Sequence, residues 1–347
     1  MYGRTRAPFW EAVLSLLSMP YRLAVKTRHT LYALRILKRN RLSCAVISVG
    51  NITLGGTGKT PAVVQIAELL LRQHAHPLVV SRGYGREDEK IVRVVSDGTA
   101  LLVDARTGGD EPVLIASKLS TVPVVVGRDR YRAALAACSI FQPDVVLLDD
   151  GFQHLQLQRT LDIVLIDARD PFGNGKLFPA GILREPIQAL RRAHAVLITG
   201  VEDGTDLTQL KHIIWGATRA PIFTSRQVPV DLIDCISGET KPLSTLRGSR
   251  ILAFSGIARP ASFAGLLRSL DAVLENECIY PDHYTFTRSD LAQVYKLAAD
   301  HKVSMIITTE KDAVRLKTLR PEGIWSLRIE LRVNEQNAWE RLLLNGL

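Results

Sequence analysis

From about residue 42 onward, short apolar runs alternate with longer stretches in which apolar positions recur every three or four residues. The short runs predict buried β-strands, and the longer stretches predict amphipathic helices. Because the two alternate, we expect an α/β fold of P-loop NTPase type, with a mainly parallel sheet and helices on both faces. The strands expected before residue 220 are 44–49, 77–81, 91–95, 100–103, 122–126, 145–148, 161–166 and 195–199.

The pattern begins again after Pro221, with a second strand-to-glycine-loop unit at 250–257. We therefore expect a larger domain over residues 42–220 and a smaller α/β domain over 221–347. The last helix could pack back on the larger domain. The other strands expected in the smaller domain are 223–228, 231–234, 303–308 and 325–331.

The first 41 residues contain nine Lys or Arg, Arg4 and Arg6 among them, and a single Glu, and so carry most of the net charge of +9 of the 347-residue chain. Leucines and aromatic residues lie between these cations, and Pro20 is expected to interrupt any single helix. The apolar run 12–19 is far shorter than the ~18 residues that a membrane span requires. The pattern fits a basic amphipathic segment on an anionic membrane surface. The alternative is a basic helix packed on its own domain.

The composition, with 46% hydrophobic and 23% charged residues, is that of a folded globular protein. Four widely separated cysteines indicate reduced thiols and a cytosolic chain. Since the excess positive charge lies outside residues 42–347, nucleic acid is not an expected partner, and no protein partner is indicated.

A glycine-rich loop joins the strand 44–49 to the helix 62–71 and ends in Gly-Lys-Thr. Glycines allow backbone N–H groups to surround a phosphate, and the helix directs its positive end at the same group. Lys59 would reach the β- and γ-phosphates, and Thr60 would offer its hydroxyl to Mg²⁺. Thr53 stands where this motif usually has its first glycine. The expected nucleotide-binding residues are Thr53, Gly55, Gly56, Thr57, Gly58, Lys59 and Thr60.

Asp149 and Asp150 follow four apolar residues at the end of an expected buried strand. This is the Walker B layout, in which a carboxylate holds Mg²⁺ directly or through water. We expect both to contribute to the metal site, with Asp149 closer to the ion.

Further candidates lie in loops, where ligands of parallel α/β sheets usually bind. Arg82 and Arg86 frame two glycines and could clamp a phosphate. Asp110 and Glu111 begin a helix, and on local pattern they could equally be capping groups. The long Gly/Pro loop 170–186 is expected to be a lid that faces the substrate.

Six motifs in order along the chain resemble those of the tetraacyldisaccharide 4'-kinase family, the lipid A kinases of Gram-negative bacteria. They are Val49–Pro61, Ser81–Arg86, Gly109–Pro112, Asp149–His154, Leu183–Pro186 and the Thr-Glu-Lys-Asp-Ala-Val run that begins at Thr309. The P-loop of that family also has threonine at the position of Thr53.

The resemblance implies a peripheral enzyme on the cytoplasmic side of the bacterial inner membrane, with ATP and Mg²⁺ as cofactors. The reaction implied is transfer of the γ-phosphate of ATP to the 4'-hydroxyl of a tetraacylated disaccharide 1-phosphate. It implies Asp110 as the base, assisted by His283. We also expect Lys59 and Asp150 to be catalytic. A turn-forming role for His283 remains the alternative. The expected substrate-binding residues are Arg82, Arg86, Glu111, Arg128, Asn174 and Arg184.

A second class of function is a P-loop nucleotide switch of the metallochaperone type, either GTPase or ATPase. The sequence has no Asn-Lys-x-Asp motif for guanine and no Cys/His cluster that would store a metal.

Overall fold

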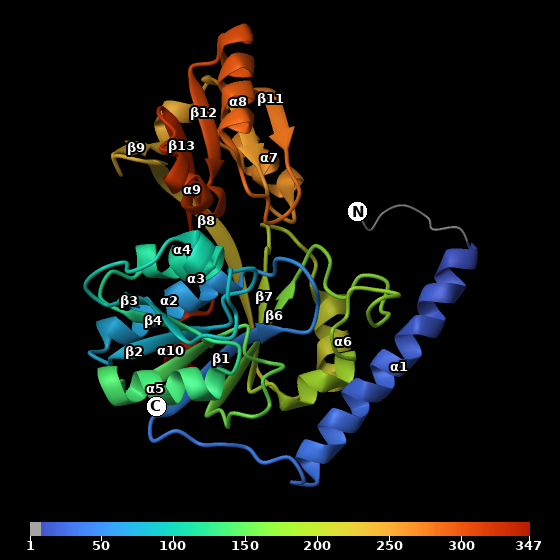
Figure 1. Ribbon diagram of the computed structural model, residues 1–347. Helices are drawn as coiled ribbons and strands as arrows, with labels where there is room; N and C mark the ends of the chain where they lie inside the picture. Colours follow the sequence, from blue (N-terminus) through green and yellow to red (C-terminus); the bar gives the residue numbers. More distant parts are fainter. Residues whose placement is uncertain (1–7) are drawn as a thin grey trace.

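The computed structural model describes residues 8–347 and shows two α/β lobes stacked end to end, with one long helix along the side of the larger lobe (Figure 1). A single path of hydrogen-bonded strands runs through both lobes, in the order β11-β10-β12-β13-β8-β7-β6-β1-β5-β2-β4-β3. The α/β class and the mainly parallel sheet are confirmed. No helix of residues 8–347 is long and apolar enough to cross a membrane.

The larger lobe is a sheet in which β3 alone runs antiparallel to its neighbour within residues 45–199. Its strands are β1 (Ala45–Asn51), β2 (Pro77–Ser81), β3 (Arg93–Asp97), β4 (Pro123–Val126), β5 (Val145–Asp149), β6 (Leu161–Asp167) and β7 (Ala195–Thr199). Its helices are α2 (Lys59–Arg72), α3 (Ala105–Gly108), α4 (Asp110–Lys118), α5 (Arg130–Phe141), η1 (Ile187–Arg192) and α6 (Thr208–Ala217).

Both faces of this sheet are buried, because successive strand residues point to opposite sides. In β1, Ile47 packs in the cluster beneath α2 and α4, whereas Val46 packs in the cluster beneath α5. Such two-sided burial explains the continuous apolar runs in the sequence. The parallel register brings the carboxyl ends of β1, β2, β5 and β6 to one edge.

The smaller lobe has its own parallel strands and core. Its strands are β8 (Ile222–Asp234), β9 (Thr240–Pro242), β10 (Arg250–Ser255), β11 (Val273–Ile279), β12 (Met305–Thr309) and β13 (Ile324–Val333). Its helices are η2 (Leu243–Leu246), α7 (Pro260–Ser269), α8 (Arg288–Asp300), α9 (Glu310–Leu316), η3 (Lys317–Leu319) and α10 (Gln336–Leu344). The last of these, α10, returns to the larger lobe, where Trp339 is fully buried and donates to Gln65 of α2.

Two expected strands, 223–228 and 231–234, form the single strand β8, so that prediction was wrong. β8 pairs with β7 at its start and with β13 along its length, and thereby connects the two lobes. Pro229 lies inside β8, although proline lacks the N–H that a ladder needs. Here it lies beside a register shift between Arg328 and Ile329, where the ladder is already irregular. The expected strand 100–103 is also reduced, to an isolated bridge between Ser96 and Leu101.

Helix α1 (Pro8–Ala33) passes through Pro20 without ending, contrary to the expected interruption. Proline removes one hydrogen bond from a helix, and contacts along the rest of α1 compensate. The Tyr21 hydroxyl donates to the carbonyl of Arg184 (2.8 Å), and Arg28 donates to the carbonyl of Gln153 (2.9 Å). His29 lies 3.4 Å from the buried Glu185. Arg4 and Arg6 lie outside the described residues.

Candidate active site

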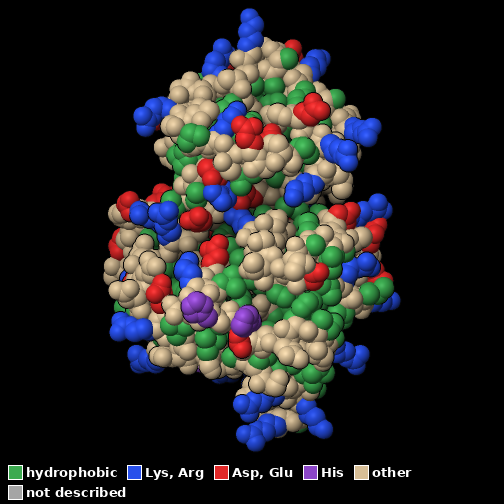
Figure 2. All heavy atoms as spheres, turned by 90° about the vertical axis from the view of Figure 1, so that its left-hand side faces the viewer, with side chains coloured by type: hydrophobic (Ala, Val, Ile, Leu, Met, Phe, Trp, Pro, Cys, Tyr) green, Lys and Arg blue, Asp and Glu red, His purple; other side chains and the backbone are tan. Residues whose placement is uncertain are grey.

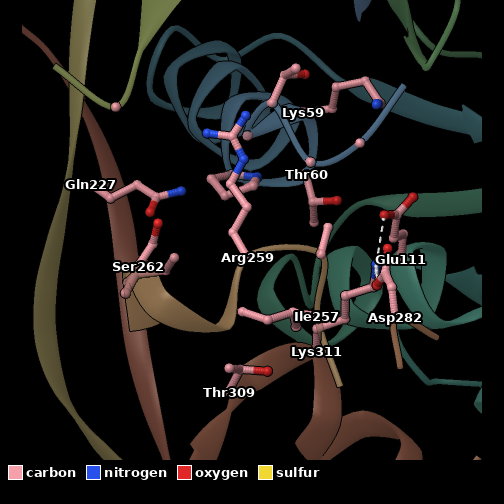
Figure 3. Close-up of a pocket in the computed structure, with 18 of the residues that line it drawn as sticks. Lys59, Thr60, Glu111, Gln227, Ile257, Arg259, Ser262, Asp282, Thr309 and Lys311 are labelled. Atoms are coloured by element: carbon pink, nitrogen blue, oxygen red, sulfur yellow. Dashed lines mark hydrogen bonds and ion pairs between the residues drawn. The ribbon is translucent and has the colours of Figure 1, made fainter. Parts of the chain in front are cut away.

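A cleft of about 1470 Å³ lies between the two lobes and is lined by residues of both. Acidic and basic side chains of both lobes gather at the waist between them (Figure 2). In close-up, Lys59 and Thr60 of the larger lobe face the same space as Ile257 and Lys311 of the smaller lobe (Figure 3). The sheet edge that carries the carboxyl ends of β1, β2 and β5 opens into this cleft, through the glycine loop, Ser81 and Asp149.

The glycine loop has the geometry of an anion cradle. Gly55 and Gly58 have φ of +98° and +82°, a backbone conformation that residues with a Cβ rarely adopt. At Gly55 and Gly56 the space where a Cβ would stand is open, which leaves room for a ligand beside the backbone. Gly58 is also the N-cap of α2 and provides no side-chain cap, so the first N–H groups of the helix remain available.

Around this cradle, the structure brings together all but one of the expected nucleotide-binding residues. The Thr57 carbonyl accepts from the hydroxyl of Thr199 (2.9 Å), and the Thr57 hydroxyl accepts from Asn51 (3.0 Å), which fixes the loop. Thr53 does not line the cleft; it is buried and bridged to Leu183.

Asp149 is fully buried at the end of β5, and its Oδ2 accepts from the Ser81 hydroxyl at 2.7 Å. Its Oδ1 is buried and has no hydrogen-bond partner among residues 8–347. Burial, and after it the nearby charge of Glu111, raise the pKa of Asp149 to about 7. A buried carboxylate oxygen without a donor suits a bound cation, which would supply the missing charge.

Asp150 has a different environment. It adopts φ of +51°, and its carboxylate accepts two hydrogen bonds from Arg184 Nη1, at 2.8 and 3.0 Å. Lys59 Nζ lies 3.7 Å from the same carboxylate. Burial acts against ionisation, but Lys59 and Arg184 hold the pKa of Asp150 well below its usual range.

Asp110 and His283 meet across the cleft, 173 residues apart in sequence. His283 Nδ1 lies 3.1 Å from Asp110 Oδ2, and Arg315 Nε donates to the same oxygen at 2.7 Å. Asp110 is the first residue of α4, and the N-cap, Gly109, makes no side-chain cap. The capping alternative therefore does not describe Asp110, whose carboxylate turns toward the other lobe. Although burial opposes it, the donors His283 and Arg315 lower the pKa of Asp110.

Further ion pairs join the lobes. Lys311 Nζ lies 3.2 Å from Glu111 Oε1 (Figure 3). On the other side of the cleft, Arg259 pairs with Asp167 at 2.8 Å. Arg169 also binds Asp167 and donates to Ser262 of α7 (3.0 Å).

Some expected substrate-binding residues lie elsewhere. Arg86 is buried and donates to the carbonyls of Glu89 and Ile91, so its guanidinium braces its own loop. Arg128 and Asn174 do not line the cleft. Asn174 donates to the carbonyl of Ala180 (2.9 Å) and accepts from the backbone of Lys176, which folds the loop on itself.

The loop 170–186 is also not a free lid. Its second half is hydrogen-bonded to the P-loop strand, from Leu54 N to the carbonyl of Ile182 and from Arg184 N to the carbonyl of Ile52, both at 2.7 Å. This pairing places Arg184 in the cleft.

Sequence reasoning missed several side chains of the cleft. Arg130 lines the cleft, whereas the expected residue was Arg128, two positions earlier in the same arginine-rich segment. Tyr84 lies between the two arginines of its loop and packs edge-on against His283. Lys311 lies within the Thr-Glu-Lys-Asp-Ala-Val motif, and Arg315 directly follows it. The motif marked this segment as characteristic of the family but did not indicate what the two cations contact.

The chain is similar to known proteins over nearly its whole length. The family model for tetraacyldisaccharide-1-P 4'-kinase, LpxK, matches residues 10–347. The chain belongs to this family of kinases. A protein named tetraacyldisaccharide 4'-kinase from Syntrophus aciditrophicus is 41% identical, with 98% of this chain and 94% of the relative covered. One from Anaeromyxobacter sp. strain Fw109-5 is also 41% identical, with 92% and 87% covered.

A crystal structure described as the "apo" form of LpxK from Aquifex aeolicus in complex with ATP has a TM-score of 0.80 against this structure. The two chains are 32% identical, and the match covers 97% of this chain and 99% of the other. Both lobes of this tetraacyldisaccharide 4'-kinase are therefore shared with a solved member of its family.

Proposed function

We propose that this enzyme transfers the γ-phosphate of ATP to the 4'-hydroxyl of tetraacyldisaccharide 1-phosphate, with Asp110 as the base. The observation that carries the proposal is the Asp110–His283 pair, which lies in the same cleft as the glycine cradle and comes from opposite lobes. A base and a phosphate cradle that share one cleft are what transfer to a hydroxyl requires.

In this proposal, the acceptor oxygen forms a bond to the γ-phosphorus while the bond from phosphorus to the β–γ bridging oxygen breaks. The hydroxyl proton passes to Asp110, and ADP and the 4'-phosphorylated lipid are the products. Lys59 and the N–H groups at Gly55–Thr60 balance the negative charge of the phosphates. Arg82, Arg130 and Arg184 line the cleft and are candidates for binding the phosphate and hydroxyl groups of the disaccharide.

The residues that would hold Mg²⁺ are Asp149 and Thr60. Asp149 has a free buried oxygen, whereas both carboxylate oxygens of Asp150 are engaged by Arg184. When bound, Mg²⁺ neutralises charge on the β- and γ-phosphates. Asp150 would position Arg184 and Lys59 in the cleft.

We also propose that α1 attaches the enzyme to the cytoplasmic face of the inner membrane as a peripheral protein. Basic residues along α1, among them Lys26, favour anionic lipid, and apolar side chains of α1 stand in solvent. The large exposed apolar residues of α1 are Phe9, Trp10, Leu16, Leu17, Met19 and Leu23.

The direct test is the transfer of ³²P from γ-labelled ATP to the purified lipid disaccharide, followed by thin-layer separation. We expect a labelled lipid whose formation depends on Mg²⁺. Hydrolysis of ATP without a labelled lipid would contradict the proposal and favour a nucleotide switch.

A further inference from the structure

Helix α9 brings two cations to the Asp110–His283 pair, from the lobe opposite Asp110. Lys311 and Arg315 are four residues apart, so they lie on one face of the helix. Arg315 is nearly buried, with 5% of its side chain exposed. Its Nη1 donates to Asp312 and to the carbonyl of Gly256, both at 2.8 Å, while Nε donates to Asp110. These bonds hold the guanidinium in one orientation.

Lys311 contacts the second ring nitrogen of His283. Its ammonium Nζ lies 3.2 Å from His283 Nε2, and an ammonium group can only donate. Nε2 is therefore the acceptor nitrogen, and the ring proton is on Nδ1. This tautomer donates from Nδ1 to Asp110 Oδ2. Arg315 Nη2, at 3.4 Å from Nδ1, makes no hydrogen bond there because both groups are donors in this tautomer.

The consequence is an asymmetric carboxylate at Asp110. Oδ2 accepts from both His283 and Arg315, whereas no donor among residues 8–347 reaches Oδ1. Oδ1 is then the oxygen available to a substrate hydroxyl. The neutral imidazole has no free lone pair, since Lys311 occupies the one on Nε2.

We propose that Arg315 and Lys311 are positioning residues of the phosphoryl transfer: Arg315 holds the Asp110 carboxylate ionised with Oδ1 toward the acceptor, and Lys311 holds His283 as the neutral Nδ1–H tautomer. This inference rests on the proposed role of Asp110 as the base. It assigns the proton to Asp110 Oδ1 and gives His283 an orienting role.

The local charges decide the sign of the expected pH effect. Two anions, Glu111 and Asp282, would favour a protonated Asp110, but Lys311 lies between them, at 3.2 and 3.8 Å. Asp312 is compensated by Arg315 itself. Removing Arg315 therefore leaves Asp110 without its one directly bonded permanent cation, and its pKa must rise. The groups that face this cluster from all sides are Lys59, Arg82, Tyr84, Glu111, Asp282, His283, Lys311, Asp312 and Arg315.

The test is the pH dependence of kcat at saturating ATP for Arg315→Gln and Arg315→Lys. In Arg315→Gln we expect the acid limb of the profile to move to higher pH. If the pKa of Asp110 rises by one pH unit, kcat at a pH below that pKa should fall about tenfold and should recover at alkaline pH. Arg315→Lys keeps a cation and should retain the wild-type limb. The matched control is Lys317→Gln, which removes an exposed cation from the residues directly after α9.

A uniform loss of kcat at every pH in Arg315→Gln would mean a structural role and overturn the proposal. If Arg315→Gln does not fold, Lys311→Met and the ¹⁵N NMR spectrum of His283 decide. We expect a neutral Nδ1–H ring in the wild type and a loss of that single tautomer in Lys311→Met. A protonated ring or an Nε2–H ring in the wild type at neutral pH would contradict the assignment.

The two proposals fail separately. An active Asp110→Asn variant would remove the base assignment. An inactive Asp110→Asn variant combined with an unmoved acid limb in Arg315→Gln would remove only the role of Arg315.

Discussion

Asp150 receives both of its short hydrogen bonds from one nitrogen of Arg184, whereas its neighbour Asp149 has an oxygen that no donor in the described part of the chain reaches. Two adjacent carboxylates thus have separate environments, and we expect separate phenotypes. Asp149→Asn should raise the Mg²⁺ concentration needed for half-maximal activity or abolish turnover. Asp150→Asn should lower kcat with a smaller change in the Mg²⁺ requirement. Mg²⁺ titrations of both variants at fixed ATP check this; the opposite ranking would place the ion at Asp150.

Proton and metal should compete at Asp149. Because its pKa is raised to about 7, the carboxyl is protonated below that pH and must lose the proton to bind a cation. We expect the apparent affinity for Mg²⁺ to weaken as the pH falls from 8 to 6. Isothermal titration calorimetry in two buffers of different ionisation enthalpy should report proton release. Binding without pH dependence would exclude Asp149 as a ligand.

The same shift has a consequence for folding stability without metal. The folded pKa of Asp149 lies above its unfolded value, so its contribution is fully present below the unfolded pKa and is lost as the pH rises through about 7. In EDTA, Asp149→Asn should therefore be more stable than wild type at pH 8 and gain less at pH 5. Thermal unfolding at the two pH values measures this difference.

Lys59→Ala should lose most turnover and keep its fold. Lys59 is the P-loop cation and lies 3.7 Å from Asp150, so the variant removes positive charge from the phosphate site. Circular dichroism and kcat measured on one preparation separate the two effects. Near-normal kinase activity would mean that the nucleotide binds elsewhere.

Asp110→Asn tests the base directly. An amide cannot accept the hydroxyl proton as a carboxylate does, so kcat should fall by roughly 10²–10⁴, with ATP affinity nearly unchanged. His283→Ala should also be slow. If the pair works as one unit, the double variant should lose less than the product of the single losses. Fully multiplicative losses would show that the two side chains act independently.

Removing apolar side chains from α1 should release the enzyme from membranes without harming the chemistry. Leu16→Ser with Leu23→Ser changes two exposed leucines, and we expect weaker co-sedimentation with anionic vesicles. Leu102→Ser, at an exposed leucine of the larger lobe, is the matched control. Unchanged vesicle binding in the double variant would place the membrane contact outside this surface.

The features that the sequence predicted correctly are formed by residues that are adjacent in the sequence. The glycine loop follows the buried strand β1, and Asp149 is the last residue of the buried strand β5, so an apolar run and a short motif were sufficient to predict them. Lys311 and Glu111 are 200 residues apart and meet only because β8 and β13 connect the lobes. Pairs of residues so far apart produce no recognisable local pattern in the sequence, so they could not be predicted from it. The helix break expected at Pro20 was wrong for the opposite reason, because a local rule was outweighed by tertiary contacts along α1.

Two hydrogen bonds hold α1 against the larger lobe, from Tyr21 to the carbonyl of Arg184 and from Arg28 to the carbonyl of Gln153. They therefore also fix the distance between α1 and the cleft. If α1 attaches to the bilayer as proposed, these bonds would fix the height of the cleft above the lipid. Drawing acyl chains into water costs about 0.8 kcal/mol for each CH₂ group, so a substrate with four chains cannot be lifted out to meet the enzyme. The sugar must be phosphorylated at the height where the bilayer presents it. We therefore regard α1 as a spacer that matches the active site to the position of a headgroup.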